Sequence, residues 1–231
     1  MSLILILASW YVVFVFSATV HEAAHAWAAK QGGDLTAYYG GQVSIDPIPH
    51  IRREPFGMIL LPIISLFTMH WPIGYASAPY DPYWAVRNPR KAALMALAGP
   101  ASNFVLAIVA MLIMILGMKS GVLFIPRPDQ FAAYNIVIGA TGFANGAAVL
   151  LSMLFFLNLL LGVFNLLPLP PLDGSEAITL FMKQTFLHRY RAFIQHPSFS
   201  MFGILIAWMI FGKVFAPVFH TAVGIMYLLA R

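Results

Sequence analysis

The sequence predicts an all-α polytopic membrane protein with about four to six transmembrane or re-entrant helices and a small membrane-associated β-hairpin region. Of its 231 residues, 61% are hydrophobic and only 9% are charged, whereas soluble domains have about 25% charged residues. The hydrophobic residues form long runs, several of which reach the roughly 20 residues that a transmembrane helix needs. Cysteine is absent, so disulfides and thiolate metal ligands are excluded.

The first apolar segment runs from about Leu3 to Ala29 and carries no charge before His21. Gly32 and Gly33 follow this segment and are suited to a helix C-cap. No basic residue precedes the segment, so we expect a retained membrane helix and not a cleaved signal peptide.

The next part of the chain predicts irregular and re-entrant structure. Residues 36–50 mix aromatic and β-branched residues with Gly and Pro, which predicts a short strand or hairpin. Residues 57–69 form an apolar run of only 13 residues that contains Pro62, and this run is short for a transmembrane helix. Residues 70–91 are rich in proline and aromatic side chains and predict an interfacial loop.

The second half of the chain contains the remaining predicted spans. Residues 92–118 predict a membrane helix with a Gly-Pro pair inside it, and residues 119–130 a short polar link. Residues 131–167 are apolar for 37 positions, which predicts an interfacial or kinked lead-in before a span from about Ala148. Residues 198–230 predict one bent span or a short pair of helices, because glycine, lysine and proline interrupt the run.

The end of the first apolar segment carries two histidines with a glutamate between them. His21 and His25 are four residues apart, so on a helix both imidazoles lie on one face and can bind one metal ion. Glu22 is close enough to reach a water molecule on that metal. A single histidine on an apolar face is usually structural, but this pair with its acid inside a membrane segment favours a metal site over structural polar residues.

A catalytic zinc site needs a third protein ligand and an open position for water. The soluble proteases with the same motif have a third histidine six residues later, where this chain has Gln31. Asp173 follows a long apolar segment and a proline-rich break, at a place where unpaired backbone must line protein or a water-filled cavity. Asp173 is therefore the preferred third ligand, and Glu176 is its nearest competitor. The remaining acids lie in predicted surface loops and are expected to be solvated charges: Asp34, Asp46, Glu54, Asp81 and Asp129.

Three motifs in order resemble the site-2 proteases, a family of intramembrane zinc metalloproteases. They are HEAAH at residues 21–25, AGPASNF at 98–104 and NLLPLPPLDG at 165–174. The resemblance spans roughly residues 10–185 and is to the compact bacterial and archaeal members. The chain has no room for a PDZ insertion between the second and third motifs, so it resembles the compact prokaryotic type without a PDZ domain.

The resemblance implies a ligand set and a catalytic group. The implied ligands of one zinc ion are His21, His25 and Asp173. Glu22 is implied to be the catalytic base, and Asn165 is implied to position the substrate or the developing oxyanion.

The resemblance also assigns structural parts. Gly99, Pro100 and Asn103 match a motif whose role is mainly helix packing beside the site. Residues 36–50 and 71–80 correspond to the membrane-associated β region of the family.

These features predict an intramembrane zinc-dependent endopeptidase that cleaves membrane-protein substrates in or near their transmembrane segments, as in regulated intramembrane proteolysis. We expect a single metalloprotease domain over residues 1–231, with a core at 3–185 and a C-terminal membrane helix region at 198–230. Glu22 would take a proton from a zinc-activated water. Residues 40–45 are expected either to pair with the unwound substrate as an added strand or to form a purely structural hairpin.

Two other functions use the same residues. A proteolytically silent member of the fold would act as a membrane scaffold, but it has no need of Glu22 beside intact ligands. A metal or ion transporter predicts acids and histidines spread over several helices or a repeated half, and the sequence shows neither. The expected partners are the lipid bilayer and a transmembrane protein substrate. No nucleic-acid signature is present, and the sequence leaves the oligomeric state open.

A shared metal requires the first helix and Asp173 to meet at one depth. If every apolar run crossed the membrane, Asp173 would emerge on the opposite face from His25, so residues 57–69 are predicted to be re-entrant. The face with the site then carries nine basic residues: Lys30, Arg52, Arg53, Arg87, Arg90, Lys91, Lys183, Arg189 and Arg191. The other face carries Lys119 and Arg127. The positive-inside rule therefore predicts a site on the cytoplasmic side, in a prokaryotic plasma membrane.

Overall fold

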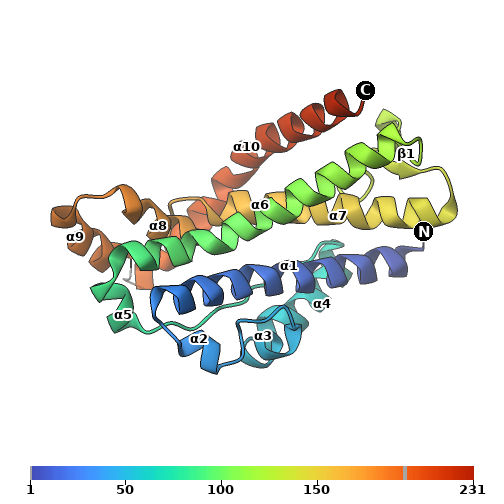
Figure 1. Ribbon diagram of the computed structural model, residues 1–231. Coiled ribbons are helices and arrows are strands. Elements are labelled where there is room, and N and C mark those ends of the chain that lie inside the picture. Colours follow the sequence, from blue (N-terminus) through green and yellow to red (C-terminus); the bar gives the residue numbers. More distant parts are fainter. Residues whose placement is uncertain (1, 195–196) are drawn as a thin grey trace.

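The computed structural model describes residues 2–194 and 197–231. Within these ranges, four helices are long and apolar enough to cross a membrane: α1 (Leu3–Gly32), α6 (Pro89–Lys119), α7 (Gly142–Asn165) and α10 (Pro197–Ala230), the last from Met201 onward. Figure 1 shows α1 and α7 running in one direction and α6 and α10 in the opposite direction. The first and third spans are therefore parallel, as a metal site shared between α1 and Asp173 requires.

The end of α1 is where the sequence predicts it. Gly33 follows the helix with φ 98°, in the left-handed region that glycine adopts without strain. Its backbone N–H bonds to the carbonyls of Ala29 and Lys30, which closes the last turn.

Residues 36–50 do not form the predicted strand or hairpin. They contain two short helices, α2 (Thr36–Tyr39) and α3 (Pro47–Arg53), with turns and bends between them. Asp46 caps α3 by accepting a hydrogen bond from the Ile48 N–H at 2.9 Å, and Pro47 has its ring at a position where no N–H is needed. The Asp-Pro pair therefore starts a helix, and the β-branched residues before it have no neighbouring strand to pair with.

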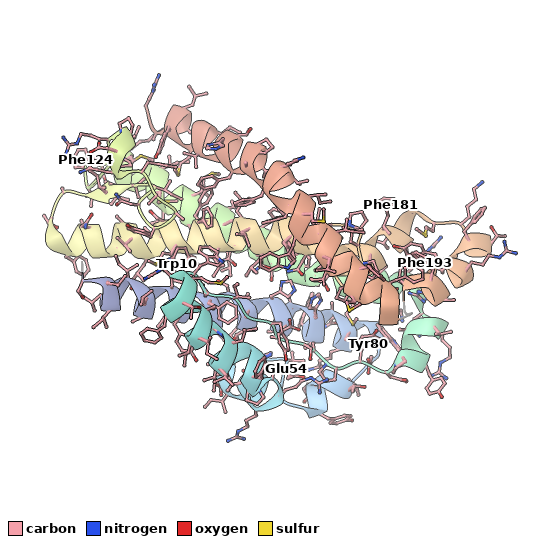
Figure 2. The ribbon with its side chains drawn as sticks, turned by 180° about the vertical axis from the view of Figure 1, so that it is seen from behind. Trp10, Glu54, Tyr80, Phe124, Phe181 and Phe193 are labelled. Atoms are coloured by element: carbon pink, nitrogen blue, oxygen red, sulfur yellow. The ribbon has the colours of Figure 1, made fainter. Side chains whose placement is uncertain are left out.

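The two-stranded antiparallel sheet of the protein lies elsewhere. β1 (Leu123–Phe124) pairs with β2 (Ile138–Gly139), with Leu123 opposite Gly139 and Phe124 opposite Ile138. Figure 1 places this sheet by α6 and α7, at the end of the bundle where α1 begins, and Phe124 is labelled there in Figure 2. The connection between the strands contains a single 3₁₀ turn, η2 (Pro128–Gln130). The predicted fold class, helical with a small hairpin, is confirmed, but the predicted position of the hairpin is wrong.

The short apolar segment after α3 leaves the end of the bundle where α1 ends and then returns to that end. It comprises a π-helical turn, η1 (Phe56–Leu60), and α4 (Leu61–Met69). At its far end, Trp71 packs on Trp10 of α1 with ring centroids 4.7 Å apart. Ser77 then donates a hydrogen bond to Glu54 at 2.5 Å, so the two ends of the segment meet. Figure 2 shows that Trp10 of α1 and Glu54, which follows α3, lie far apart in the direction of the α1 axis. The segment folds back, as the re-entrant prediction requires.

α6 is the central helix of the bundle and packs against α1, α7, α8 (Asp173–Ala177) and α10. Its contact faces are built from small buried residues, which allow close approach of helices in a membrane: Ala92, Ala93, Ala96, Ala107 and Ala110. The helix starts at Pro89, three residues earlier than predicted, because proline fits the first turn, where its missing N–H is not needed.

The outward faces of the long helices are apolar. Large side chains are exposed along them, including Ile4 at 76%, Leu116 at 67% and Met209 at 79% exposure. Soluble proteins rarely expose continuous apolar surface of this extent. Lipid contact explains this surface, because hydrocarbon is the solvent that such side chains prefer.

Candidate metal centre

Side-chain atoms from two distant parts of the chain converge near the C-terminal end of α1. His21 Nε2 and His25 Nε2 lie 3.0 Å apart on one face of α1. Asp173 Oδ2, at the start of α8, lies 3.1 Å from the first nitrogen and 3.3 Å from the second. A tetrahedral zinc ion, with bonds of about 2.0–2.2 Å, places its ligand atoms about 3.3 Å apart. The triangle therefore has the size that a zinc ion requires.

Both imidazoles are oriented through their other ring nitrogen. His25 Nδ1 donates to the Met95 carbonyl at 2.7 Å, and His21 Nδ1 donates to Asn103 Oδ1 at 2.6 Å. With the proton on Nδ1, each neutral ring presents an Nε2 lone pair to the other ring. Two lone pairs 3.0 Å apart repel one another unless a metal ion or a proton lies between them. Two imidazoles and a carboxylate are also a donor set of catalytic zinc sites, so the residues fit this metal.

Gly99 keeps open the space beside these nitrogens. A Cβ atom added at Gly99 would lie 2.3 Å from His25 Nε2 and 2.5 Å from His21 Nε2. The added Cβ would also lie 2.5 Å from His25 Cε1, so a side chain here would push both imidazoles out of their positions. The next residue, Pro100, lies inside α6 and removes one of its backbone hydrogen bonds.

Glu22 is buried beside the two histidines. Glu22 is 6% exposed. One of its carboxylate oxygens and one ring nitrogen of each histidine all lie within 4.8 Å of one another. The Asp173 oxygen is closer to both nitrogens, at no more than 3.3 Å. This difference favours Asp173 as the third ligand and leaves Glu22 free for a water molecule.

The site opens into a cavity of about 400 Å³. Its wall includes the two histidines, Glu22, Asp173 and Asn165. Asn165 Nδ2 donates one hydrogen bond to the Leu161 carbonyl at 3.1 Å, which leaves the second amide hydrogen for another acceptor.

Comparison with known proteins agrees with this geometry. The profile of peptidase family M50 matches residues 9–210. The chain belongs to peptidase family M50, the site-2 protease family.

Curated relatives of this M50 chain are bacterial. It is 34% identical over 168 residues to the Bacillus subtilis (strain 168) protein named "Putative zinc metalloprotease YwhC". The aligned region covers 72% of this chain and 66% of that protein. It is 30% identical over 207 residues to "Putative zinc metalloprotease Rip2" of Mycobacterium tuberculosis (strain H37Rv), covering 89% and 67%. The chain thus spans about two thirds of the length of these two relatives. No solved structure matches it.

Family membership and the four apolar helices together make the chain a multi-pass membrane protein of a zinc-dependent protease family. Glu176, the other candidate for the third ligand, pairs with Arg191 of α9 (Gln184–Ile194). Arg191 also donates to the Ala85 carbonyl at 2.9 Å. This pair forms part of the cavity wall, and sequence reasoning missed it because nothing in the sequence places α9 against α8.

The electrostatics of the cavity favour an ionised Asp173. Burial by itself raises the pKa of this carboxyl, but when the imidazoles are protonated, the positive charge of His25 and hydrogen bonds from His21 and His25 outweigh burial and hold the pKa below its usual range. An ionised carboxylate is the form that binds a metal. Burial raises the pKa of Tyr80, also in the cavity wall, and the Glu176 carboxylate raises it further.

Asp34 is not the solvated surface acid that its position predicts. It is 5% exposed and accepts hydrogen bonds from Thr36 N at 2.9 Å, Thr36 Oγ1 at 2.6 Å and Asp81 N at 2.8 Å. These bonds tie the end of α1 to the start of α5 (Pro82–Arg87). Asp34 is therefore a structural residue.

The segment that runs along the cavity is not residues 40–45. Those residues form turns and bends and are absent from the cavity wall, whereas Ala76, Ser77, Ala78 and Tyr80 line it. Residues 72–81 have no helix and are extended, as Figure 2 shows for the stretch that leads to Tyr80. Residues 40–45 therefore form neither the strand nor the hairpin that the sequence predicts.

Proposed function

We propose that this protein is an intramembrane zinc endopeptidase that hydrolyses peptide bonds in or near transmembrane segments of protein substrates. Membership of peptidase family M50 supports a zinc-dependent protease. The single observation that carries the proposal is the convergence of His21, His25 and Asp173 within 3.3 Å at the wall of a cavity.

One zinc ion would be held by His21 Nε2, His25 Nε2 and Asp173 Oδ2. When bound, zinc supplies a Lewis acid and lowers the pKa of a bound water to about 7. The Nδ1–H bonds of the histidines fix their orientation, and the ionised Asp173 supplies negative charge. Three protein ligands leave one tetrahedral position open for water.

Glu22 acts as the general base. Its buried carboxylate takes a proton from the attacking water and later delivers it to the leaving amine nitrogen. The second amide hydrogen of Asn165 donates to the carbonyl oxygen of the scissile bond as negative charge develops on it. Glu22 and Asn165 lie in the wall of the same cavity as the three ligands.

The substrate must be unwound, because a helix keeps the scissile bond hydrogen-bonded. Residues 75–78 are suited to bind an extended substrate. Tyr75 N donates to the Gly57 carbonyl at 3.1 Å, and the Ser77 carbonyl accepts from Gln42 at 3.2 Å. In an extended chain, the backbone groups of alternate residues point to opposite sides. Those of Ala76 and Ala78 therefore point away from these anchors and can pair with a substrate strand.

The site lies toward the cytoplasmic side of a prokaryotic plasma membrane. The site end of the bundle carries nine basic residues, against Lys119, Arg127 and Arg231 at the other end. Positive charge is enriched on the cytoplasmic side of membrane proteins. The curated relatives are bacterial proteins, which supports the prokaryotic setting.

The test compares cleavage of a transmembrane peptide by wild-type protein and by Glu22→Gln, with zinc counted in both. We expect the variant to retain zinc and to cleave about 10²–10⁴-fold more slowly, because it loses general-base catalysis. Asp129→Asn, which changes an exposed loop acid beside Arg127, should cleave like wild type. Equal cleavage by wild type and Glu22→Gln would remove Glu22 as the base.

A further inference from the structure

Behind His21, three fully buried polar side chains connect the first three membrane helices. Ser17 lies on α1, Asn103 on α6 and Asn158 on α7, and each has 0% exposure. Buried amides and hydroxyls between membrane helices are unfavourable unless they are hydrogen-bonded to one another. These residues do form such a chain, and it ends on the imidazole of His21.

The direction of every hydrogen bond in this series follows from the bond at the end farthest from His21, which is the bond to Leu154. The Leu154 carbonyl can only accept, so the Asn158 atom 2.9 Å from it is the amide nitrogen, which also donates to Ser17 Oγ at 2.8 Å. The oxygen of Asn158 then faces Asn103 and accepts from Asn103 Nδ2 at 2.8 Å. The oxygen of Asn103 is left to face His21 Nδ1 at 2.6 Å.

This polarity determines which nitrogen of His21 carries the proton. An amide oxygen can only accept, so His21 Nδ1 must donate, and a neutral His21 ring presents its Nε2 lone pair to His25 and Asp173. With Asn103 rotated by 180°, its NH₂ group would face Nδ1 and favour the other tautomer, which cannot bind a metal through Nε2. Asn158 prevents that rotation.

We propose that Asn158, anchored by the Leu154 carbonyl and Ser17, is a positioning residue of the metal centre. It acts through Asn103 to fix the tautomer and ring orientation of His21. This proposal rests on the proposed function of His21 as a zinc ligand. It gives Asn103 a role beyond helix packing and assigns one to Asn158, which lies outside the three sequence motifs. His25 does not depend on this chain, because its Nδ1 donates directly to the Met95 carbonyl.

The first experiment measures zinc affinity by competition with a chromophoric chelator, using the full-length protein in detergent. Asn158→Leu, which keeps a similar volume but no polar group, should bind zinc about 10–100-fold more weakly than wild type, the effect typical of residues that orient metal-bound histidines. The matched control is Ser152→Ala. Ser152 is also fully buried on α7, and it accepts a hydrogen bond from Ile136 N at 3.1 Å, away from His21. This control should bind zinc like wild type.

A double-mutant cycle tests whether Asn158 acts through Asn103. If it does, Asn158→Leu has no further effect on zinc affinity once Asn103→Leu is present. If the two fold-changes multiply, Asn158 acts on the helix bundle in general and the proposal is wrong. Thermal unfolding of the zinc-free proteins measures the structural effect separately, and Asn158→Ala replaces Asn158→Leu if the latter does not fold.

His21→Ala separates the two ways of failing. If His21→Ala binds zinc as tightly as wild type, His21 is not a ligand and the proposed function fails with this inference. If His21→Ala loses zinc while Asn158→Leu binds it like wild type, the ligand assignment stands and only the positioning role of Asn158 is refuted.

Discussion

Single residues of this protein carry out functions that depend on partners far away in the sequence. His21 and Asp173 are 152 positions apart, yet their Nε2 and Oδ2 atoms lie 3.1 Å from one another. Met95 contributes its backbone carbonyl, which accepts a hydrogen bond from His25 Nδ1 and fixes that ring. The chemistry of the centre is thus set by a few polar atoms that an apolar bundle holds at one depth.

Asp34 gives a prediction about pH at this scale. Burial raises the pKa of its carboxyl, but the hydrogen bonds from Thr36 and from the Asp81 N–H outweigh burial and lower it. A depressed folded-state pKa contributes stability above the unfolded value of about 3.9, and this stability is lost as pH falls through the folded value.

We therefore expect Asp34→Asn to destabilise the protein at pH 7 by about 1–3 kcal/mol, because buried hydrogen bonds to a charged acceptor are weakened. The difference from wild type should shrink as the pH is lowered below about 4. Thermal unfolding in detergent at pH 7 and at low pH measures both effects. A destabilisation that stays constant over this range would show that the charge of Asp34 contributes nothing.

The residues of the centre could be predicted from the sequence to different degrees. The spacing of His21 and His25 is local and follows from helix geometry. Asp173 could be selected only because a proline-rich break makes an acid at that depth unusual. The contact of Asn103 with His21 could not be predicted, because it depends on the relative rotation of two helices and on one side-chain rotamer.

At the scale of elements, the approach of α6 to α1 determines whether a metal fits. Gly99→Ala places a Cβ 2.3 Å from His25 Nε2 and 2.5 Å from His21 Nε2, too close for either ring to keep its position. We expect this variant to fold and to lose zinc binding, as measured by metal analysis of the purified protein. Gly146→Ala, on α7 with no heavy atom within 4 Å of the added Cβ, should keep its zinc. Full zinc binding by Gly99→Ala would show that this glycine serves packing alone.

The long helices were predictable and the short elements were not. Apolar runs of 20 or more residues identify spans by length and composition, so α1 and α6 begin and end within a few residues of their predicted bounds. α7 begins at Gly142, earlier than the predicted Ala148, because Thr141 caps it by accepting from Ala144 N. The two-residue strands β1 and β2 are too short to give a periodic pattern.

At the scale of the whole molecule, the segment Phe56–Met69 folds back, and α1 and α7 run in parallel. Tyr39 of α2 and Tyr83 of α5 flank this segment and are 79% and 78% exposed. The chain has no cysteine, so single cysteines at these positions and at Gly121 can be labelled with a membrane-impermeant reagent. We expect Tyr39→Cys and Tyr83→Cys to react from the cytoplasmic face and Gly121→Cys from the opposite face.

The pair Tyr39 and Tyr83 decides the topology. A helix that crosses the membrane between residues 57 and 69 would place these two cysteines on opposite faces. Such a result would also put His25 and Asp173 on opposite sides of the bilayer. The position of Gly121 relative to Tyr83 confirms that α6 crosses, and the face on which both tyrosine positions react gives the orientation of the site.

The most direct measurement of the metal centre is the zinc content of the purified protein and of two acid variants. We expect one zinc per chain in wild type, loss of zinc in Asp173→Ala, and retention in Glu176→Gln, because Asp173 lies within 3.3 Å of both histidine nitrogens whereas Glu176 pairs with Arg191. Zinc retained by Asp173→Ala and lost by Glu176→Gln would contradict the ligand assignment and, with it, the proposed metal centre.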